Sequence, residues 1–494
     1  MSCARAPRGS SGSRRSSSPQ RQALHADHEP RRHGNTEQIF SRLRDIVGPD
    51  FVRSDDASRD FYGVDALGKG HPPDVVVIPE NTGQIAAVAR LCNEQRVPLV
   101  VRGAGTGFTG GAVPTCGGVV LSMERLNRIL EIDGLNLLAV VEPNVINADL
   151  QREVEKAGLF YPPDPASLNQ SSIGGNVAEC AGGPRAFKYG VTKRYVLALE
   201  AVLPTGEIVN TGSKAVKNVV GYDLTQLLVG SEGTLAIITK ITLRLVPKPP
   251  ANQTLLATFD GIRGAVDAVS ELIRRRVVPA AVELIDSDSL AAIEENLGGG
   301  FVAPGTGAAL IVEVDGTERG VEEDLDRVVE ACRSVGAKEI SRAKSEAERE
   351  NIWSLRRQTS VALKKTGLIK INHDVVVPRG RVPELFDVIA EMKRTSGLRI
   401  ASFGHAGDGN IHINLLITPG DADEAARAKQ AERYLFTRVV ELEGSISGEH
   451  GIGFAKAPYL SIELSGEEIA LMKRVKAAFD PNGILNPGKI FPTG

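Results

Sequence analysis

The stretch RGAGTGFTGGAVP, residues 102–114, places five glycines and two threonines between two short apolar segments. Glycines let successive backbone amides point into one concave nest, and threonine hydroxyls add donors, so the loop suits a phosphate or pyrophosphate. Gly105, Gly107 and Gly110 match the G-x-G-x-x-G spacing, but Pro114 follows where a Rossmann fold needs a helix. The stretch therefore predicts a phosphate-binding loop of another fold. A plain glycine-rich surface turn is the alternative that this loop alone leaves open.

A strand-helix-strand unit leads into this loop. Apolar runs predict strands over 74–79 and 98–103, with a helix between them that is capped by Asn81 or Thr82 and ends near Asn93. An earlier helix is expected over 38–47. Residues 1–36 are rich in Ser, Arg and Pro and predict a disordered tail, although a mitochondrial transit segment has a similar composition.

Two further glycine-rich segments follow the first loop. Residues 162–192 contain two Gly-Gly pairs and Gly190, and residues 229–247 join a glycine turn to what we interpret as a pair of β-branched strands. Three such segments within one region indicate a single extended polar ligand.

Together, RGAGTGFTGG, SSIGGNVAECAGGPRAFKYGVT and GSEGTLAIIT resemble the FAD-binding domain of the vanillyl-alcohol oxidase/p-cresol methylhydroxylase family. The remainder resembles the C-terminal domain of FAD-linked oxidases, and the whole is most similar to the glycolate oxidase D subunit and the D-lactate and D-2-hydroxyglutarate dehydrogenases. The resemblance implies an α+β fold with a two-subdomain FAD-binding domain over 37–249. An antiparallel-sheet cap domain with helices on one face would follow over 250–436, and a C-terminal segment over 437–494 would return to the flavin.

The resemblance also implies FAD, bound non-covalently because the first loop lacks the histidine that some relatives link to the flavin. It places the pyrophosphate on the first loop and the flavin ring near the second segment. The residues expected to bind the cofactor are Gly103, Ala104, Gly105, Thr106, Gly107, Thr109, Gly110, Pro163, Asp164, Gly174, Gly175, Asn176, Gly182, Gly183, Tyr189, Gly190, Glu232, Gly233, Ile237 and Asn486.

Histidines gather in the last quarter of the chain. In FGHAGDGNIHINLL, residues 403–416, strand alternation puts His412 and Asn414 on one face, and His405 precedes a turn that can fold back toward them. The segment SISGEHGIGFAK, residues 445–456, supplies Glu449 and His450 between glycines. Two imidazoles and a carboxylate are the ligands of a catalytic divalent metal site. A structural strand histidine and a loop histidine are the alternative that the spacing alone leaves open.

The resemblance assigns roles to these residues. It implies that His405, His412 and Glu449 bind one divalent metal, zinc first, with manganese or iron as alternatives. His450 would be the catalytic base, Arg356 in a helix over 351–365 would hold the substrate carboxylate, and Asn414 would belong to the catalytic set. The base would take the hydroxyl proton of a 2-hydroxy acid while hydride moves to flavin N5. Where some relatives carry a substrate lysine, this chain has Asn372 and His373, and Lys370 is offset.

Composition limits the partners. A net charge of −3 without basic blocks argues against nucleic acid. The five scattered cysteines indicate neither a disulfide framework nor an iron–sulfur cluster and favour a reducing compartment. We therefore expect a cytoplasmic protein, peripheral to the inner membrane through a partner, with a mitochondrial location as the alternative. Reduced flavin would pass its electrons to a quinone, a cytochrome or partner redox subunits, within a homodimer or a hetero-oligomer.

The favoured function is FAD-dependent oxidation of a small 2-hydroxy acid of the glycolate or D-lactate type. Two alternatives remain. A metal-independent flavin oxidase of an alditol or related alcohol would use the same first domain but would not need His405, His412 and Glu449. A non-catalytic flavoprotein subunit would use a metal only to hold the cap in place.

Overall fold

The chain opens with a small sheet that carries the glycine-rich loop. The computed structural model describes residues 36–298 and 300–492. The four strands run in the order β1-β2-β4-β3, parallel except for β1. They are β1 (Val52–Arg53), β2 (Val75–Val77), β3 (Leu99–Arg102) and β4 (Val119–Ser122). The loop at 103–118 joins β3 directly to β4 without a helix, as its proline and glycines predict.

Two helices cover this sheet. They are α1 (Thr36–Val47) and α3 (Thr82–Gln95), which pack on each other and share one hydrophobic core with the strands. The Asn81 side chain caps α3 by accepting a hydrogen bond from the Gln84 amide at 3.0 Å. The predicted helices and strands of this region are therefore confirmed. The predicted tail lies outside the described residues except for Thr36, which begins α1.

A second sheet has five antiparallel strands in the order β5-β6-β10-β8-β9. They are β5 (Ile129–Asp133), β6 (Leu138–Val141), β8 (Val196–Val202), β9 (Ile208–Gly212) and β10 (Ile237–Arg244). Helices α4 (Asn147–Lys156) and α5 (Ile173–Glu179) share its core. The predicted strand pair over 229–247 is wrong. β10 pairs with β6 and β8 instead. The only other strand within residues 229–247 is the two-residue β11 (Val246–Pro247).

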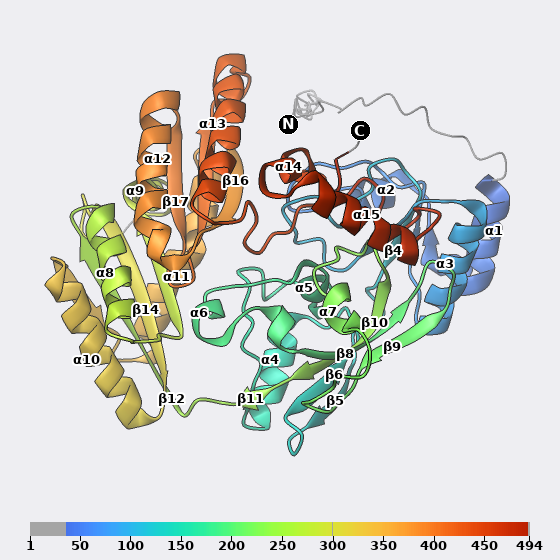
Figure 1. Ribbon diagram of the computed structural model, residues 1–494, viewed down its shortest axis with the longest axis horizontal. Helices are drawn as coiled ribbons and strands as arrows, with labels where there is room; N and C mark the ends of the chain where they lie inside the picture. The colour runs from blue at the N-terminus through green and yellow to red at the C-terminus, as the bar shows by residue number, and fades with distance from the viewer. Residues whose placement is uncertain (1–35, 299, 493–494) are drawn as a thin grey trace, which may run out of the picture.

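The third sheet holds seven antiparallel strands in the order β15-β12-β14-β13-β17-β18-β16, at the opposite end of the molecule in Figure 1. They are β12 (Ala251–Phe259), β13 (Ala281–Asp286), β14 (Ala308–Gly316), β15 (Glu339–Arg342), β16 (Ile369–Val376), β17 (Arg399–His405) and β18 (Asn410–Ile417). The expected antiparallel-sheet architecture of the second half is confirmed.

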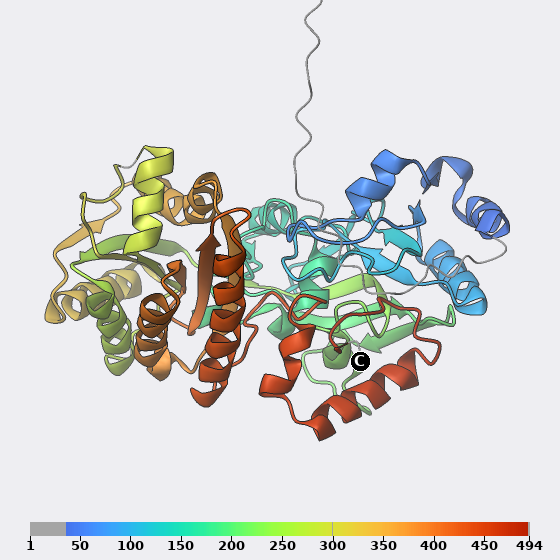
Figure 2. The ribbon, with the colours of Figure 1, turned by 90° about the horizontal axis from the view of Figure 1, so that it is seen from above.

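Helices cover both faces of this sheet, whereas the sequence led us to expect them on one. Four helices, α8 (Ile262–Arg274), α10 (Glu318–Ser334), α12 (Val382–Ser396) and α13 (Ala422–Glu441), share a core with one face. The other face packs against α9 (Ser287–Leu297) and α11 (Glu346–Lys365), as Figure 2 shows. The reason lies in β14, whose first seven residues are all buried, so that both of its faces need cover.

The end of the chain returns to the first sheet. After α15 (Gly466–Phe479), Leu485 forms a parallel bridge with Leu99 of β3. The Leu99 amide donates to the Ile484 carbonyl at 2.8 Å, and the Asn486 amide donates to the Leu99 carbonyl at 2.8 Å. Residues 484–486 therefore extend the sheet that carries the glycine-rich loop. Within residues 36–298 and 300–492, every helix is too short or too polar to cross a membrane.

Candidate active site

The hairpin of β17 and β18 supplies two buried imidazoles. β17 ends at His405, and His412 lies across from Phe403 in the hairpin and from Asp374 of the neighbouring β16. Asn414 pairs with Asn372 on the same face of the sheet, as strand alternation predicts. The predicted ribbon therefore points His412 and Asn414 in one direction.

Glu449 joins these imidazoles from the loop that follows α13. Its Oε1 lies 3.5 Å from His405 Nε2 and 3.5 Å from His412 Nε2. One ligand atom from each of the three residues lies within 4.8 Å of the others. The predicted convergence of His405, His412 and Glu449 is therefore present in the structure.

This cluster has the chemistry of a divalent metal site. The second oxygen of Glu449, Oε2, is buried without a hydrogen-bond partner among the described residues. Two imidazole nitrogens and a carboxylate, with further positions open, match the ligands that zinc and related ions take at catalytic sites. Gly182 comes close to this carboxylate, because a side-chain carbon there would lie 2.9 Å from Glu449 Oε2. The donors present fit one divalent ion.

Glu283 of β13 orients His405. Its Oε1 lies 2.5 Å from His405 Nδ1, which leaves Nε2 directed toward Glu449. Burial opposes ionisation of Glu283, but His405 and Arg356 outweigh it and lower the pKa of this carboxyl. Burial also opposes protonation of His405, but Glu283 and Glu449 hold the pKa of the imidazole well above its usual value. A carboxylate behind a histidine is a common arrangement at metal sites, where it fixes the ring and its tautomer.

Asp374 of β16 holds His450. One oxygen of Asp374 accepts hydrogen bonds from the amides of Gly448, Glu449 and His450 at 3.0, 2.7 and 2.9 Å. The other lies 3.3 Å from His450 Nδ1 and pairs with Lys456 Nζ. Burial opposes ionisation of Asp374, but these partners hold the pKa of the carboxyl well below its usual value. The other ring nitrogen, His450 Nε2, lies 3.9 Å from Glu449 Oε1.

His450 also contacts the glycine-rich loop. The Phe108 ring lies 5.2 Å from the His450 ring, and Thr109 Oγ1 donates to the His450 carbonyl at 3.0 Å. On its other side, His450 stacks on His412 with 5.3 Å between ring centroids. The site therefore lies where the glycine-rich loop of the first half meets the sheet of the second half.

The glycine-rich loop presents a row of free backbone donors. The seven amides of residues 103–109 donate no hydrogen bond to any other described residue. Gly105 adopts a φ of 68°, which favours glycine, and a side-chain carbon at Gly107 would meet only Asp65 Oδ2, at 4.0 Å. Such a row of amides suits the pyrophosphate of FAD. The buried Asn176 Nδ2 on α5 is likewise without a partner in the described chain.

Several other expected cofactor residues make contacts within the protein. Tyr189 donates from its hydroxyl to Asp315 at 2.6 Å, and Glu232 accepts from the amides of Ile452 and Gly453. The Ile237 side chain is buried in the core of the first sheet, so only its backbone is available to a ligand.

Further expected cofactor residues also make contacts within the chain. Asn486 Nδ2 donates to the carbonyls of Gly111 and Glu232, each at 2.7 Å. Asp164 accepts from the Arg185 amide at 3.1 Å, and burial raises the pKa of Asp164 to about 7. The carbonyl of Pro163 accepts a hydrogen bond from the Gln151 side chain. Five of the expected glycines pack so closely that an added side-chain carbon would clash with a neighbouring segment, namely Gly103, Gly110, Gly174, Gly183 and Gly190. The roles of these residues toward FAD stay predictions.

The other residues of the expected catalytic set, Arg356 and Asn414, lie around the same sheet face together with Lys370. Arg356 is buried, with Nε donating to Glu283 and the guanidinium 4.7 Å from the centre of the Phe403 ring. Asn414 Nδ2 donates to the carbonyls of Ala401 and His412, and its Oδ1 accepts from Asn372 at 2.8 Å. Lys370 Nζ donates to Ser360, and burial lowers the pKa of Lys370 to about 8.

Three residues of this site were not anticipated from the sequence, namely Glu283, Asp374 and Lys456. The two acids stand inside apolar strand segments, AVELID and INHDVV, where a single acid gives no signal of its own. An acid at a strand position that is otherwise buried is the one feature that would have singled them out, because such a charge needs a partner.

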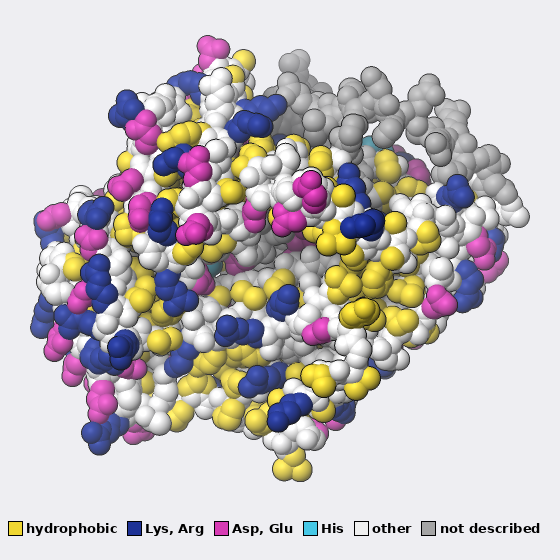
Figure 3. Space-filling model, viewed as in Figure 1, with side chains coloured by type: hydrophobic (Ala, Val, Ile, Leu, Met, Phe, Trp, Pro, Cys, Tyr) yellow, Lys and Arg dark blue, Asp and Glu magenta, His cyan; other side chains and the backbone are white. Residues whose placement is uncertain are grey.

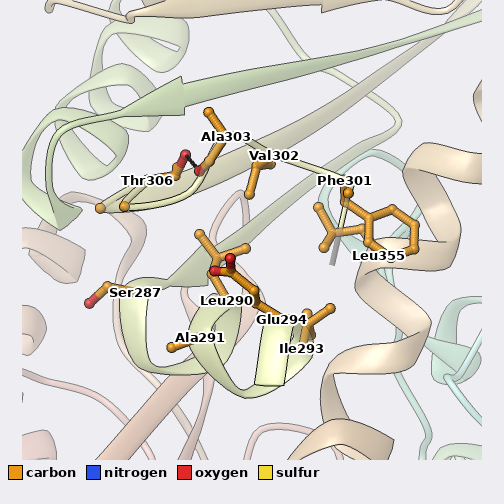
Figure 4. Close-up of a pocket in the computed structure, with 13 residues that line it drawn as sticks. Ser287, Leu290, Ala291, Ile293, Glu294, Phe301, Val302, Ala303, Thr306 and Leu355 are labelled. Carbon is orange, nitrogen blue, oxygen red and sulfur yellow. Dashed lines mark hydrogen bonds between the residues drawn. The ribbon is translucent and has the colours of Figure 1, made fainter. Parts of the chain in front are cut away.

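A separate pocket of about 260 Å³ lies on the outer side of α9 (Figure 4). Leu290 and Ile293 of α9, Leu355 of α11 and the loop carrying Phe301 and Val302 line it. None of the predicted site residues lines this pocket.

Comparisons with known families and proteins agree with this geometry. Residues 73–212 match the family model described as an FAD binding domain, and residues 248–490 match that of the FAD linked oxidases, C-terminal domain. The chain is 43% identical over 457 residues to glycolate oxidase subunit GlcD of Bacillus subtilis, covering 92% of this chain and 97% of that protein. It is 36% identical to a D-lactate dehydrogenase of Anaerostipes hadrus, over 92% of this chain and 97% of that one.

A solved structure shares the fold. The crystal structure of p-cresol methylhydroxylase with substrate bound superposes with a TM-score of 0.76 at 18% identity, covering 93% of this chain and 97% of the other. The expected architecture, a p-cresol methylhydroxylase-type FAD-binding domain followed by an antiparallel-sheet domain, is confirmed.

Proposed function

This chain belongs to the FAD-linked oxidases, and from that premise we propose that it oxidises a small 2-hydroxy acid to the corresponding 2-keto acid. Glycolate and D-lactate are the model substrates, because relatives at 43% and 36% identity are named for oxidation of these two acids. The convergence of His405, His412 and Glu449 beside His450 and the glycine-rich loop is the observation that carries the proposal.

His450 is the proposed base. Its Nδ1 faces the Asp374 carboxylate, so Nε2 is the nitrogen free to take the hydroxyl proton of the substrate. Asp374 also fixes the backbone that leads to the ring through the amides of residues 448–450. A ring fixed by an anion behind it is held in one orientation, which is what proton removal from an alcohol requires.

The proposed cofactor residues hold FAD non-covalently. The amides of 103–109 would bind its pyrophosphate, and residues 174–176 would lie near its ring. When bound, FAD supplies the acceptor for the hydride that leaves the substrate carbon. A divalent metal on His405, His412 and Glu449, zinc first with manganese or iron as alternatives, would stabilise negative charge on substrate oxygen.

Two cations, the buried Arg356 and the half-buried Lys370, support an anionic substrate. Arg356 uses Nε on Glu283 and keeps its other nitrogens for a carboxylate. Lys370 lies close enough for Arg356 to contribute to lowering its pKa. Donors of this kind favour an acid over a neutral alditol, because the free nitrogens of Arg356 and the Lys370 amine can hydrogen-bond a carboxylate.

The electrons must then leave the protein. We propose a quinone, a cytochrome or partner redox subunits as the acceptor, since one relative is named as a subunit of an oxidase. A homodimer or a hetero-oligomer is consistent with this role. A cytoplasmic location is proposed, with a mitochondrial one as the alternative; the four cysteines of the described residues are free thiols.

The test is anaerobic flavin reduction. Purified protein with measured FAD and metal content is mixed with glycolate, D-lactate, L-lactate, D-2-hydroxyglutarate and an alditol, and flavin bleaching is followed. The proposal expects bleaching by one or more of the hydroxy acids and its loss on chelation. Bleaching by the alditol that survives chelation would indicate the metal-independent oxidase. A flavin that none of these substrates reduces would indicate a non-catalytic subunit.

The base assignment has its own variant. His450→Ala should leave yellow, metal-loaded protein that substrate reduces at least about a hundredfold more slowly, because the proton acceptor is gone. His71→Ala is the matched control, since this exposed histidine lies outside the site. Stopped-flow flavin reduction measures both, and an unchanged rate in His450→Ala would remove His450 from the mechanism.

A further inference from the structure

The loop at 213–223, between β9 and α7 (Leu224–Leu228), exposes an unusual set of hydrophobic side chains. Among the described residues, five large hydrophobic side chains are at least 80% exposed, and four of them lie in this loop. They are Val216, Val219, Val220 and Tyr222, with exposed fractions from 80% to 96%. Side chains this exposed do not pack on their own neighbours, so the apolar surface of the loop is unsatisfied by this chain.

The apolar surface extends onto neighbouring elements. Leu224 and Leu227 of α7 are 41% and 39% exposed, and Leu471 of α15 is 53% exposed. α15 lies near α7, because Lys476 donates to the carbonyl of Thr234, a few residues beyond that helix. Figure 3 shows hydrophobic side chains gathered over the part of the molecule where Figure 1 draws α7 and α15.

The loop carries two lysines and, at its last position, one acid. Residues 213–222 contain Lys214 and Lys217 and no acid. Lys214 pairs with Glu131, whereas Lys217 has no ion pair within the described chain. The next acid, Asp223, accepts from the Gln226 amide at 3.0 Å and so caps α7. The apolar side chains therefore stand beside an unpaired cation rather than an anion.

We propose that this loop inserts into the surface of a lipid bilayer that carries anionic headgroups. Valine side chains would enter the boundary of the acyl chains, and the tyrosine would sit at headgroup level, where its ring and hydroxyl are both satisfied. Lys217 would pair with the lipid phosphates. No described helix crosses a membrane, so the contact is peripheral.

The shape of the loop selects this occupant over a protein groove. Val219 and Val220 are adjacent in sequence and both more than 90% exposed, so both faces of the chain protrude at that point. A rigid partner would need a pocket that encloses the tip, whereas a bilayer adapts to it. Unpaired positive charge next to apolar side chains matches an anionic membrane surface in both respects.

Vesicle sedimentation with the full-length, FAD-loaded protein tests the proposal. The probes are vesicles of phosphatidylcholine alone and vesicles with an equal part of phosphatidylglycerol. The wild type should sediment with the anionic vesicles, and raised salt should weaken this binding. Val219→Ser combined with Val220→Ser should lower the bound fraction at least about fivefold. Lys217→Gln should reduce binding to the anionic vesicles only.

Leu135→Ser provides the matched control. Leu135 is 97% exposed but lies in the turn between β5 and β6, outside the loop, so this variant should bind vesicles like the wild type. Flavin reduction in solution should be unchanged in all variants, which separates this test from that of the proposed reaction. The proposal would be overturned if the wild type does not sediment with anionic vesicles, or if the double variant binds them as well as the wild type does. A dimer in solution that the double variant loses would instead assign the loop to a second copy of the chain.

Discussion

Asp374 is the residue on which the geometry of His450 depends. Its carboxylate accepts hydrogen bonds from the three successive backbone amides of residues 448–450, pairs with Lys456 and faces His450 Nδ1. Asp374→Asn keeps the shape but removes the charge, so flavin reduction by substrate should slow by about a thousandfold.

The control for Asp374→Asn is Asp286→Asn. Asp286 is equally buried in the same half of the molecule, but it caps α9 and bonds the Ser402 amide rather than a histidine. Rapid-reaction kinetics and FAD titration of both variants distinguish a positioning role from general damage. Equal losses in the two variants would mean that Asp374 acts through stability alone.

Asp65 makes stability depend on pH. It lies beside the glycine-rich loop, its Oδ2 has no partner among the described residues, and burial raises its pKa from 3.8 to about 6. A carboxyl whose pKa is raised on folding contributes stability below the unfolded value and loses it as pH rises through the folded value. Between pH 4 and 6 the wild type should therefore lose up to about 3 kcal/mol through this residue.

Asp65→Asn removes that titration. The variant should become more stable relative to the wild type as pH rises from 4 to 6 and keep its advantage at neutral pH. Denaturant unfolding at fixed excess FAD measures this difference. Parallel stability curves for the two proteins over that interval would show that Asp65 is not buried as described.

At this scale the sequence is informative only where side-chain chemistry stands out. His405 and His412 are two of only eight histidines in the chain, Glu449 lies in a glycine-rich segment, and the convergence of the three was predicted. Glu283 and Asp374 were not, because their partners lie 122 and 76 positions away in the chain. The register of the seven-stranded sheet pairs Glu283 with His405, and the packing of the 445–450 loop against β16 brings His450 to Asp374.

Asn486 connects the glycine-rich loop to the turn that carries Glu232. Its side-chain Nδ2 donates to the carbonyls of Gly111 and Glu232, and its Oδ1 accepts from Lys489 Nζ at 3.2 Å. Asn486→Gly keeps the backbone geometry at φ 43° but leaves two buried carbonyls unpaired. We expect a loss of about 2–4 kcal/mol in stability together with weaker FAD binding.

Asn482→Gly is the control for Asn486→Gly. This exposed residue in the same segment bonds only Asn93. Thermal unfolding and FAD titration should separate the two variants, and equal FAD affinities would confine Asn486 to a structural role.

Elements were predicted well where periodicity is strong and less well where neighbours decide. The helices predicted over 38–47 and from Asn81 or Thr82 to near Asn93 correspond to α1 and α3. The number of covered sheet faces was not predicted, although the run ALIVEV in β14, which is apolar on both sides, indicated that both faces are covered. The partners of β10 come from earlier in the chain, so its own sequence could not reveal them.

At the scale of the whole molecule, the site depends on two halves keeping their places. Helix α6 (Ala186–Tyr189) contacts β14 through Asp315, which bonds the Tyr189 hydroxyl and the Lys188 ammonium. Asp315→Asn should slow flavin reduction by about tenfold while FAD affinity stays unchanged, because the substrate side shifts relative to the cofactor side.

Tyr62→Phe is the control for the link between the halves. Its hydroxyl bonds Glu124 at 2.7 Å within the first half alone, so reduction should keep its normal rate. Steady-state kinetics beside FAD titration is the measurement. If Asp315→Asn lowered FAD affinity and rate together, the contact would belong to the cofactor site instead.

The return of residues 484–486 to β3 also constrains how this protein is made. The strand that precedes the glycine-rich loop is synthesised long before residues 484–486, which complete its edge. The nascent chain must therefore keep that edge from wrong partners until those residues leave the ribosome. A stop codon just before residue 484 would damage the first sheet of the fold, far from the lesion in sequence.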